Sequence, residues 1–539
     1  MSHAMLLDCT LRDGAYLVEK EFGENNIYGI IDGLVKARVD CIEIGFLENG
    51  GGRKGKTVFK NSEDAKRVIP KDKQGILFCV LADYSRYSIE LLDKHTDDGI
   101  DAVRECFFKK ERYDAIKYCE NIKNLGYKCF VQPVDILGYS DMELIDFIQK
   151  VNEIEPYCFS IVDTFGSMFQ EDLHRIFEII NHNLVPTCKI GFHSHNNMQL
   201  SNALSQEFIR MAYGKREIIV DGTISGMGRG AGNTPTELVA QYMVSKLGYN
   251  YDMDAILDII DEYMDNIKSR CSWGYSTSYF VAGCYSAHVN NVQYLTKKNS
   301  IKSKDIRYIL NKIDPCQRKR YDYGLLEKTY VEYLKSDIND SEETKYLLKY
   351  TDEKDLLLMA PGNSINLEKE EINDYIADKR PVIINVNFIH DEIRPDFLYF
   401  SNIKRYKYWK KDERFDEYNK IIISNIKQNA ESEKEHIIAF NKLVKCGWNN
   451  LDNSMILLLR LVDQLNVKSI AIAGLDGFNY ENGDSTNYLS RDMEVSYIRD
   501  DFMNVNAEIT AMLEDYKKNR KKKVKIEFIT KSRFADIFL

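Results

Sequence analysis

Two histidines separated by one residue, His193 and His195, stand at the end of an apolar run that begins near Lys189. Side chains alternate along a strand, so residues two positions apart project from the same face. Two imidazoles on one face can bind a single metal ion. A His-x-His pair also occurs in ordinary polar loops, so the pair alone does not establish a metal site.

A carboxylate at the end of another apolar run completes the predicted site. Asp13 lies in the segment Thr-Leu-Arg-Asp-Gly, after the first apolar run of the chain. One carboxylate and two imidazoles form a facial set for a hard or borderline divalent cation, with positions left open for substrate. We therefore predict that Asp13, His193 and His195 bind a divalent metal, Mn2+ or Mg2+.

A glycine-rich loop follows the last expected strand of this half. Five glycines fall within the eleven residues from Gly222 to Gly232. Glycine lets the main chain approach a ligand closely, so Gly228 and Gly230 are predicted to contact substrate. The side-chain oxygen of Asn233 is a candidate fourth metal ligand. The alternative is that the loop is only a turn.

The bulk composition excludes several classes of protein. The 539 residues exceed one core, so two or three domains are expected. A net charge of -10 argues against a general binder of nucleic acid or of anionic membranes. No apolar run approaches the ~20 residues of a membrane helix. The chain start lacks the order of a signal peptide, and the twelve cysteines include no Cys-x-x-Cys pair, so we expect a cytoplasmic protein with free thiols.

The order of the elements predicts an α/β fold. From residue 5 to about 246, short apolar runs alternate with longer amphipathic stretches. Eight runs over this length favour a (β/α)8 TIM barrel over an open sheet, and active sites of this fold lie at the C-terminal ends of the strands. The predicted strands are 5–11, 41–47, 76–82, 102–108, 129–136, 158–164, 189–195 and 218–222.

The second half shows fewer alternating units. Residues 336–354 are polar and are predicted to form a linker. Residues 355–539 then predict an open, Rossmann-like α/β sheet, because the units are too few for a second barrel. The full dinucleotide fingerprint is absent, so NAD binding is not expected. Its predicted strands are 355–359, 381–386, 397–400, 469–473 and 524–529.

The three motifs of the first half together resemble a known family. The Asp-x-Thr-Leu-Arg-Asp-Gly start, the His-x-His pair and the Gly-x-Gly-x-Gly-Ala-Gly-Asn loop are similar to those of the metal-dependent HMGL-like (DRE-TIM) lyase superfamily. This superfamily includes 4-hydroxy-2-oxovalerate aldolase, hydroxymethylglutaryl-CoA lyase and isopropylmalate synthase, and the aldolase branch is the most similar. The resemblance covers residues 5–335 and implies a barrel at 5–270 followed by a helical extension at 271–335. It also implies a 2-oxo acid and an aldehyde as reactants, a partner dehydrogenase and a homodimer.

The resemblance assigns roles to individual residues. It implies the metal ligands named above, with Asn233 as the fourth, and gives Arg12 the role of stabilising an enolate as an always-protonated donor. The aldolase pattern has a histidine where this chain has Tyr16. A phenol with a pKa near ~10 is a poor base at neutral pH, so Tyr16 is predicted to orient substrate or to shuttle a proton. Tyr285 and His288 are further catalytic candidates.

Charged residues within the predicted strands require partners. Glu43 and Arg104 both lie in apolar runs. A buried unpaired carboxylate is costly, so Arg104 either pairs with Glu43 or binds a substrate carboxylate. Thr164, at the end of the sixth predicted strand, is also a predicted substrate contact.

The second half resembles the Rossmann-like domains of bacterial sialyltransferases and archaeal pterin pyrophosphokinases. The shared features are an Ala-Pro-Gly-Asn-Ser turn, an Ile-Asn-Val-Asn strand and a Gly-Leu-Asp-Gly turn. The resemblance implies a nucleotide or sugar nucleotide that faces Gly362, Asn363, Ser364, Asn387 and Asp476. The alternative is a structural domain with an inherited fold and no activity.

Four functions therefore follow from the sequence. The leading prediction is a divalent-metal-dependent aldolase that acts on a 2-oxo acid such as pyruvate. A condensing enzyme that joins an acyl-CoA to a 2-oxo acid is the nearest alternative. The others are a binding or regulatory protein with a non-catalytic barrel, and a glycosyl or nucleotidyl transferase in the second half.

Overall fold

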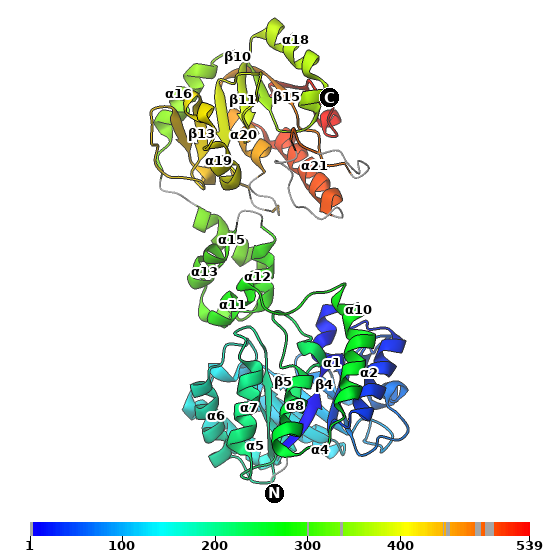
Figure 1. Ribbon diagram of the computed structural model, residues 1–539. Helices are drawn as coiled ribbons and strands as arrows, with labels where there is room; N and C mark the ends of the chain where they lie inside the picture. Colours follow the sequence, from blue (N-terminus) through cyan, green and yellow to red (C-terminus); the bar gives the residue numbers. More distant parts are fainter. Residues whose placement is uncertain are drawn as a thin grey trace. The chain divides into compact units, whose positions relative to one another are not determined.

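The computed structural model describes residues 4–298, 301–334, 338–445, 447–448, 453–479, 487–490 and 501–539. The chain forms two compact units (Figure 1). The first contains Met1–Gln293 with Ile313–Tyr321, and the second contains Tyr294–Lys312 with Asp322–Leu539. Within the described part of the chain, no helix is long and apolar enough to cross a membrane.

The first unit is a closed barrel of eight parallel strands, as predicted. The strand order β1-β9-β8-β7-β6-β5-β4-β2 is closed by pairing of β1 with β2, and the short strand β3 pairs with β2. The strands are β1 Ala4–Asp8, β2 Cys41–Leu47, β3 Val58–Phe59, β4 Leu77–Asp83, β5 Ala102–Phe107, β6 Lys128–Pro133, β7 Cys158–Asp163, β8 Lys189–Ser194 and β9 Ile218–Gly222.

Helices surround the barrel (Figure 1). Those between the strands are α1 Thr10–Asp13, α2 Glu24–Lys36, α3 Ser62–Ala65, α4 Arg112–Asn124, α5 Asp141–Ile154, α6 Gln170–Asn183 and α7 Ser201–Ala212. The helices after β9 are α8 Thr236–Leu247, α9 Met253–Ile259, α10 Asp265–Lys268, α11 Thr277–Cys284, α12 Val289–Thr296, α13 Ser303–Lys312, α14 Pro315–Arg318 and α15 Tyr323–Leu334, of which α13 and α15 belong to the second unit.

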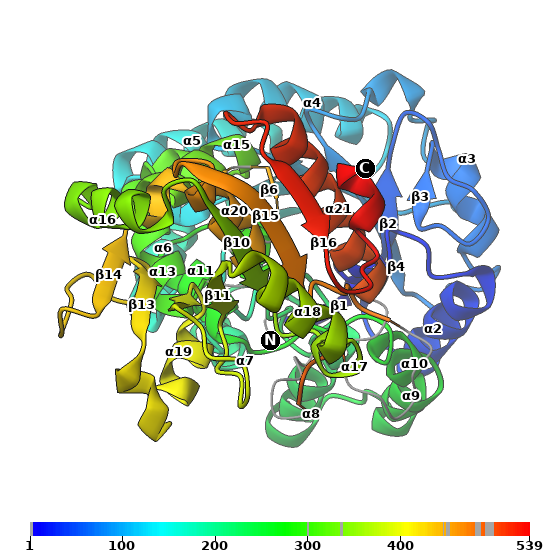
Figure 2. The same cartoon turned by 90° about the horizontal axis from the view of Figure 1, so that it is seen from above.

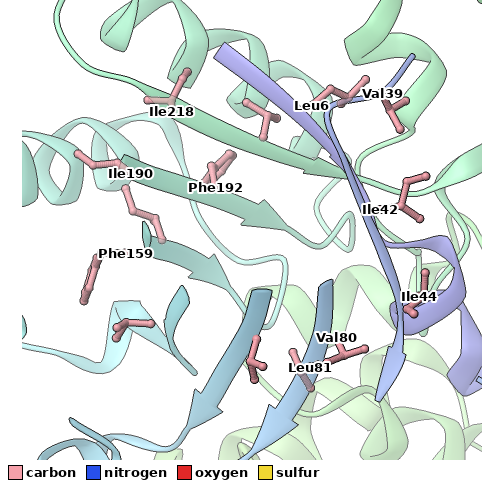
Figure 3. Close-up of a cluster of buried hydrophobic side chains, with 14 of the residues drawn as sticks. Leu6, Val39, Ile42, Ile44, Val80, Leu81, Phe159, Ile190, Phe192 and Ile218 are labelled. Carbon is pink, nitrogen blue, oxygen red and sulfur yellow. The ribbon is translucent and has the colours of Figure 1, made fainter. Parts of the chain in front are cut away.

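Alternation along the strands separates the packing face from the chemical face. In β8, Ile190 and Phe192 belong to the main apolar core, and the rings of Phe192 and Phe208 of α7 have centroids 5.3 Å apart. Figure 3 shows this layer of buried side chains, including Leu6 and Ile42. The other face of β8 carries His193 toward the barrel interior. The apolar pattern therefore orients the histidines through the burial of their neighbours.

The first predicted strand was too long. β1 ends at Asp8, and residues Thr10–Asp13 form the helical turn α1. The carboxylate of Asp8 accepts a hydrogen bond from the backbone N–H of Thr10 at 2.9 Å, a local turn that competes with strand pairing. Arg12 and Asp13 therefore lie on a helical turn beyond the strand, above the barrel opening.

The second unit contains a parallel sheet of seven strands, ordered β14-β13-β12-β11-β10-β15-β16. Figure 2 shows β10, β15 and β16 as neighbouring strands of this sheet. The order reverses between β10 and β15, which is the doubly wound pattern of a Rossmann-like sheet. The sequence prediction missed β13 and β14. The strands are β10 Lys354–Met359, β11 Val382–Val386, β12 Phe397–Phe400, β13 Asn419–Ile423, β14 Glu435–Ile438, β15 Val467–Ala473 and β16 Lys525–Phe528.

Most of the predicted linker, 336–354, is a helix that packs on this sheet, while residues 336 and 337 lie outside the described part. In α16 (Ser341–Thr351), Leu347 is buried and Glu343 pairs with His436 at 2.6 Å. The polar sequence before α16 is its N-terminal turn, so polarity there did not mark a linker. The remaining helices are α17 Ser364–Leu367, α18 Lys369–Lys379, α19 Ile403–Trp409, α20 Ser454–Val462 and α21 Asp501–Asn519.

The predicted helical extension, 271–335, does not form one unit. The first compact unit takes α11 and the strap Ile313–Tyr321, which contains α14, whereas the second takes α13 and α15. The strap returns to the barrel because its backbone is bound there. The Arg318 carbonyl accepts hydrogen bonds from the His288 N–H at 2.9 Å and from the Asn291 side chain at 2.7 Å.

Candidate functional site

A cavity of about 800 Å3 lies at the C-terminal ends of the barrel strands. Strands β4 to β8 contribute Leu81, Cys106, Gln132, Val162 and His193 to its wall. The segments after β1, β8 and β9 also reach it. This is the end of the barrel at which the sequence predicted the site.

The three predicted metal ligands converge in this cavity. Asp13 lies between the two imidazoles: His193 Nε2 is 3.4 Å from Oδ2, and His195 Nε2 is 3.8 Å from Oδ1. One ligand atom from each residue can be chosen so that all three lie within 4.8 Å of one another. Asp13 and His193 are buried, while the His195 side chain is 15% exposed.

Hydrogen bonds orient both imidazoles for metal binding. His193 Nδ1 lies 2.9 Å from Asp221 Oδ2, and His195 Nδ1 lies 3.0 Å from the carbonyl oxygen of Asp163. Each acceptor favours the proton on Nδ1, which leaves the lone pair of Nε2 directed at Asp13. His193 Nε2 is buried without a hydrogen-bond partner among the described atoms. A cation would satisfy this lone pair and the carboxylate together, so the residues fit a divalent metal.

Asn233 adjoins the same three residues. Its Nδ2 donates to Asp13 Oδ1 at 3.2 Å and to the Met227 carbonyl at 3.0 Å, and its Oδ1 is buried without a partner among the described atoms. Gly228 makes this arrangement possible, because a Cβ there would lie 2.2 Å from Asn233 Nδ2. Gly228 thus makes room for Asn233 and does not line the cavity.

Below the metal ligands, buried charges form a continuous network. Arg12 Nε donates to Glu43 Oε2 at 2.7 Å, and Arg104 Nη1 donates to the same oxygen at 2.8 Å. Arg12 also pairs with Asp13, and Arg104 with Asp221. Each buried charge therefore has an opposite partner, as burial requires.

The network sets the protonation of the ligands. Burial alone would raise the pKa of Asp13, but the positive charge of Arg12 and the two adjacent imidazoles hold that pKa well below its usual range. Burial opposes a charged His193, yet the neighbouring carboxylates of Asp13 and Asp221 raise its pKa in the metal-free chain. Asp13 is therefore an anion at neutral pH, and His193 must lose its proton when a metal binds.

Arg104 does not line the cavity, where one of its two predicted roles, binding a substrate carboxylate, would require it. Its side chain is fully buried, it pairs with Glu43 and Asp221, and it is absent from the cavity wall. The structure favours the pairing alternative, because the two carboxylates hold the guanidinium inside the barrel. Asp221, which connects Arg104 to His193, was not predicted. Its position at the end of a predicted strand, where active-site residues of this fold lie, could have indicated it.

Tyr16 lines the cavity and is packed between an aromatic ring and a cation. Its ring lies edge-on to Phe46, with centroids 5.3 Å apart, and the guanidinium of Arg229 lies 3.9 Å from its ring centroid. Burial raises the pKa of the Tyr16 hydroxyl above its ordinary value of 10. Tyr16 is therefore a proton donor at neutral pH. Arg229, hidden among the glycines of the loop, was not predicted.

Tyr285 is not part of the cavity wall, whereas His288 is. The ring of Tyr285 lies 5.2 Å from the guanidinium carbon of Arg318. Burial and, to a smaller extent, Arg229 lower the pKa of His288 to about 4. Its Nδ1 accepts the backbone N–H of Asn290 at 3.1 Å, so the neutral ring carries its proton on Nε2 and can donate it in a hydrogen bond.

Of the remaining predicted substrate contacts, one lines the cavity and one does not. Thr164 lines the cavity, and its hydroxyl accepts the backbone N–H of Asp135 at 2.8 Å. Gly230 does not line it. Its φ of +69° and the Asn197 Oδ1 atom, 2.7 Å from where a Cβ would lie, require glycine there. Asn197 was missed by the prediction, although it lines the cavity two residues after His195.

A second, smaller cavity of about 220 Å3 lies where the strand order of the seven-stranded sheet reverses. Gly362, Asn387 and Asp476 line it after β10, β11 and β15 respectively, while Asn363 and Ser364 do not. The backbone N–H of Ser364 donates to Asp476 Oδ2 at 2.8 Å, so Ser364 orients that carboxylate. Gly362 is required because a Cβ would lie 2.2 Å from the Gly474 carbonyl oxygen.

Comparison with known proteins agrees with the motifs and the barrel. The profile of the HMGL-like family matches residues 3–262. These residues belong to the HMGL-like family.

Relatives of this part of the chain include lyases of two kinds. The chain is 26% identical over 321 residues to a 4-hydroxy-2-oxovalerate aldolase of Pseudomonas putida, which covers 56% of this chain and 88% of the relative. It is 26% identical over 261 residues to an oxaloacetate decarboxylase of Mycobacterium tuberculosis, covering 47% of this chain and 74% of the relative. The crystal structure of the HMG-CoA lyase of Bacillus subtilis shares 15% identity and a TM-score of 0.41, covering 50% of this chain and 94% of that one.

Proposed function

We propose that the HMGL-like barrel is a divalent-metal-dependent carbon–carbon lyase of the aldolase type that acts on a 2-oxo acid. The observation that carries this proposal is the donor set of Asp13, His193 and His195. The Nε2 atoms of both imidazoles lie beside one carboxylate, in the wall of a large cavity. The similarity to 4-hydroxy-2-oxovalerate aldolases over the same residues supports the same reaction class.

Each group at the site has a defined part in this proposal. A bound Mn2+ or Mg2+ supplies Lewis acidity toward the oxygens of a 2-oxo acid. Arg12, held by Glu43 and Asp13, provides a fixed positive charge at the cavity wall for the developing enolate. Tyr16, protonated at neutral pH, donates a hydrogen bond to the oxygen of the aldehyde half, and in the addition direction it gives its proton to the alkoxide that forms there.

The test is exchange of pyruvate methyl protons with D2O, followed by NMR, with the full chain and added Mn2+ or Mg2+. We expect exchange that requires both protein and metal and that EDTA abolishes. Asp13→Ala is expected to abolish it, and Asp141→Ala, on the outer helix α5, to leave it unchanged. Metal-independent exchange, or exchange that survives in Asp13→Ala, contradicts the proposal.

An acyl-CoA condensing activity remains the alternative of the same superfamily, and release of free CoA thiol would identify it. An aldehyde co-product, a partner dehydrogenase that takes the aldehyde, a homodimer and a cytoplasmic location stay part of the proposal. The non-catalytic alternative predicts metal binding with no exchange for any 2-oxo acid.

A nucleotide or sugar nucleotide is the proposed ligand of the second cavity. Its place at the strand-order reversal supports this, since ligands of open α/β sheets bind there. We expect a nucleotide such as UDP to raise the Tm of the full chain, and Asp476→Asn to reduce the shift. No stabilisation by any nucleotide would favour a purely structural domain.

A further inference from the structure

The barrel cavity carries a surplus of positive charge, although the chain as a whole has a net charge of -10. Its wall holds twice as many basic as acidic side chains. The basic residues are Arg12, Arg86, Lys110, Arg229, Lys319 and Arg320, and the acidic residues are Asp13, Asp83 and Glu111. A bound divalent cation would increase the surplus.

Four of the six basic side chains are paired with carboxylates. Arg12 pairs with Asp13 and Glu43, Arg86 with Asp83 at 3.4 Å, Lys110 with Glu111 at 3.4 Å, and Lys319 with Asp135 at 2.5 Å. Arg229 and Arg320 differ, because no carboxylate oxygen of the described residues lies within 4.0 Å of their nitrogens. Arg229 stacks on the Tyr16 ring at 3.9 Å, and Arg320 lies over the Phe108 ring at 5.1 Å. Stacking on a ring leaves the N–H edge of a guanidinium available to an anion.

The two unpaired guanidiniums belong to opposite sides of the barrel. Arg229 follows β9, and Phe108 follows β5. These strands are separated by four steps in a closed ring of eight, so they face each other across the barrel. The metal ligands follow β1 and β8, the two strands that flank β9. Arg229 therefore belongs to the metal side, and Arg320 to the far side.

The strap holds the far-side charge at the cavity. The Arg320 carbonyl accepts a hydrogen bond from the Asn291 side chain at 2.9 Å, and the ring of the next residue, Tyr321, lies 5.0 Å from that of His288. Lys319 is tethered to Asp135, which follows β6, next to β5 in the ring. The strap thus fixes two cations opposite the metal ligands: Arg320, which has no carboxylate partner among the described residues, and Lys319, whose ammonium group is bound to Asp135.

We propose that the substrate of the barrel is a dianion. Its 2-oxo acid carboxylate lies on the metal side near Arg229, and a second anionic group, a carboxylate or a phosphate, at the other end is bound by Arg320 and Lys319. This inference rests on the proposed lyase function and specifies its substrate class. Arg320 and Lys319 are then specificity determinants, and the cavity volume of about 800 Å3 leaves room for a chain longer than pyruvate.

The test compares isosteric 2-oxo acids on the metal-loaded full chain. Exchange of the C3 protons is followed by NMR for 2-oxoglutarate, for 4-phosphono-2-oxobutyrate and for 5-methyl-2-oxohexanoate, a monoanion with a branched alkyl group in place of the second anionic group. The Kd of each compound is measured separately by calorimetry, which requires no turnover. We expect at least a ~10-fold lower KM and Kd for one or both compounds with a second anionic group than for the monoanion, and a smaller advantage at high salt. Whichever of these two compounds binds with the lower Kd identifies the second anionic group of the substrate as a carboxylate or a phosphate.

The double variant Lys319→Gln/Arg320→Gln is expected to reduce this advantage to less than ~2-fold, because the distal anion loses both partners. Lys117→Gln, an exposed charge removal on α4, is the matched control and should keep the full advantage. Equal Kd values for the monoanion and for the compounds with a second anionic group, or an advantage that survives in the double variant, would overturn the dianion inference. Failure of the lyase proposal looks different: no 2-oxo acid exchanges at all, while the Kd values still report the preference for a dianion.

Discussion

The two cavities of this chain occupy equivalent places in two parallel sheets, yet they are built for different chemistry. Both lie at the C-terminal ends of strands. Among the described residues, the barrel cavity is lined by nine charged residues and by the two candidate metal ligands His193 and His195. The described lining of the smaller cavity has one arginine, Arg405, one carboxylate, Asp476, and four asparagines: Asn387, Asn402, Asn453 and Asn487.

The comparison shows that a parallel sheet determines where a cavity forms, and that the side chains determine which ligands the cavity can bind. Parallel strands bring their C-terminal loops to one edge in both units, which is why each has a cavity there. The ligand class depends on the charges below that edge. Arg12 holds Asp13 ionised in the barrel, whereas burial raises the pKa of Asp476 in the second unit. The described lining of the first cavity thus carries several charges of both signs, and that of the second carries one of each.

The largest expected effect comes from Asp221→Asn, which removes the shared partner of His193 and Arg104. We expect the free energy of unfolding of the barrel to fall by about 3 kcal/mol, because a buried guanidinium loses a partner. Mn2+ affinity should fall by about 10- to 100-fold, because the His193 tautomer is no longer fixed. Denaturation and calorimetry with Mn2+ measure these two effects.

The matched change in the second unit is Asp476→Asn. This carboxylate has no basic side chain within 4.0 Å among the described residues and accepts hydrogen bonds from Ser364. We expect the free energy of unfolding to fall by about 1 kcal/mol, which is typical of the loss of a hydrogen bond. If Asp221→Asn and Asp476→Asn lower the free energy of unfolding equally, the buried charge network of the barrel is no stronger than the hydrogen bonds between Asp476 and Ser364. The two cavities would then not differ in this respect.

Glycine-to-alanine substitutions beside each cavity should have different effects on Mn2+ binding. Gly228→Ala places a methyl group 2.2 Å from Asn233 Nδ2, beside the metal ligands. Overpacking of this kind costs about 1–3 kcal/mol, and we expect weaker Mn2+ binding as Asn233 shifts. Gly362→Ala meets the Gly474 carbonyl at the same distance, in the second unit. It should destabilise that unit with no change in the Mn2+ Kd, and calorimetry would reveal any loss of Mn2+ affinity that contradicts this.

The two cavities should also differ in pH dependence. The pKa of His193 is raised in the metal-free chain, because the neighbouring carboxylates of Asp13 and Asp221 outweigh the opposing effect of burial. Mn2+ must displace that proton, so its affinity should fall as the pH drops through the raised pKa, by about tenfold per pH unit for one proton. The described residues that line the second cavity include no histidine, so stabilisation by a neutral nucleoside such as uridine should be equal at pH 6 and pH 8. Mn2+ titrations that give one Kd across this range would contradict the role of His193.

The smallest expected effect concerns the two faces of β5. Arg104 is paired inside the barrel, but both carboxyl oxygens of its neighbour Glu105 are buried without a hydrogen-bond partner among the described atoms. Burial raises the pKa of Glu105 well above its ordinary 4.5, so the folded chain binds a proton there that the unfolded chain releases. Stability of the native sequence therefore declines as the pH rises above that ordinary value.

Glu105→Met should remove this decline. We expect a gain of about 1 kcal/mol in the free energy of unfolding at pH 8, and a smaller gain at pH 4, where the unfolded carboxyl is also protonated. Thermal unfolding at the two pH values measures it. A loss of stability at pH 8 would indicate a partner for Glu105 that the geometry does not show.

The fold was predictable from the sequence where burial was strictly periodic. All eight barrel strands were located, and two of them, Cys41–Leu47 and Ile218–Gly222, have the predicted bounds. Errors arose where local polarity competed with tertiary packing. Asp8 ended β1 early, and α16 had the polarity of a linker although one face packs on the second sheet.

The sequence by itself determined the barrel, the spacing of His193 and His195, and the candidate ligand set with Asp13 and Asn233. These are properties of strand period and residue type, which act over a few positions. Only the tertiary structure decided that Arg104 is a buried partner, that Asp221 orients His193, and that Arg229 and Arg320 line one cavity. Glu43, Arg104 and Asp221 are far apart along the chain, and such pairings depend on which strand ends the closed barrel brings together. The local sequence does not show which residues this closure brings together. A carboxylate in the sequence looks identical whether its partner in the fold is a metal, an arginine or water.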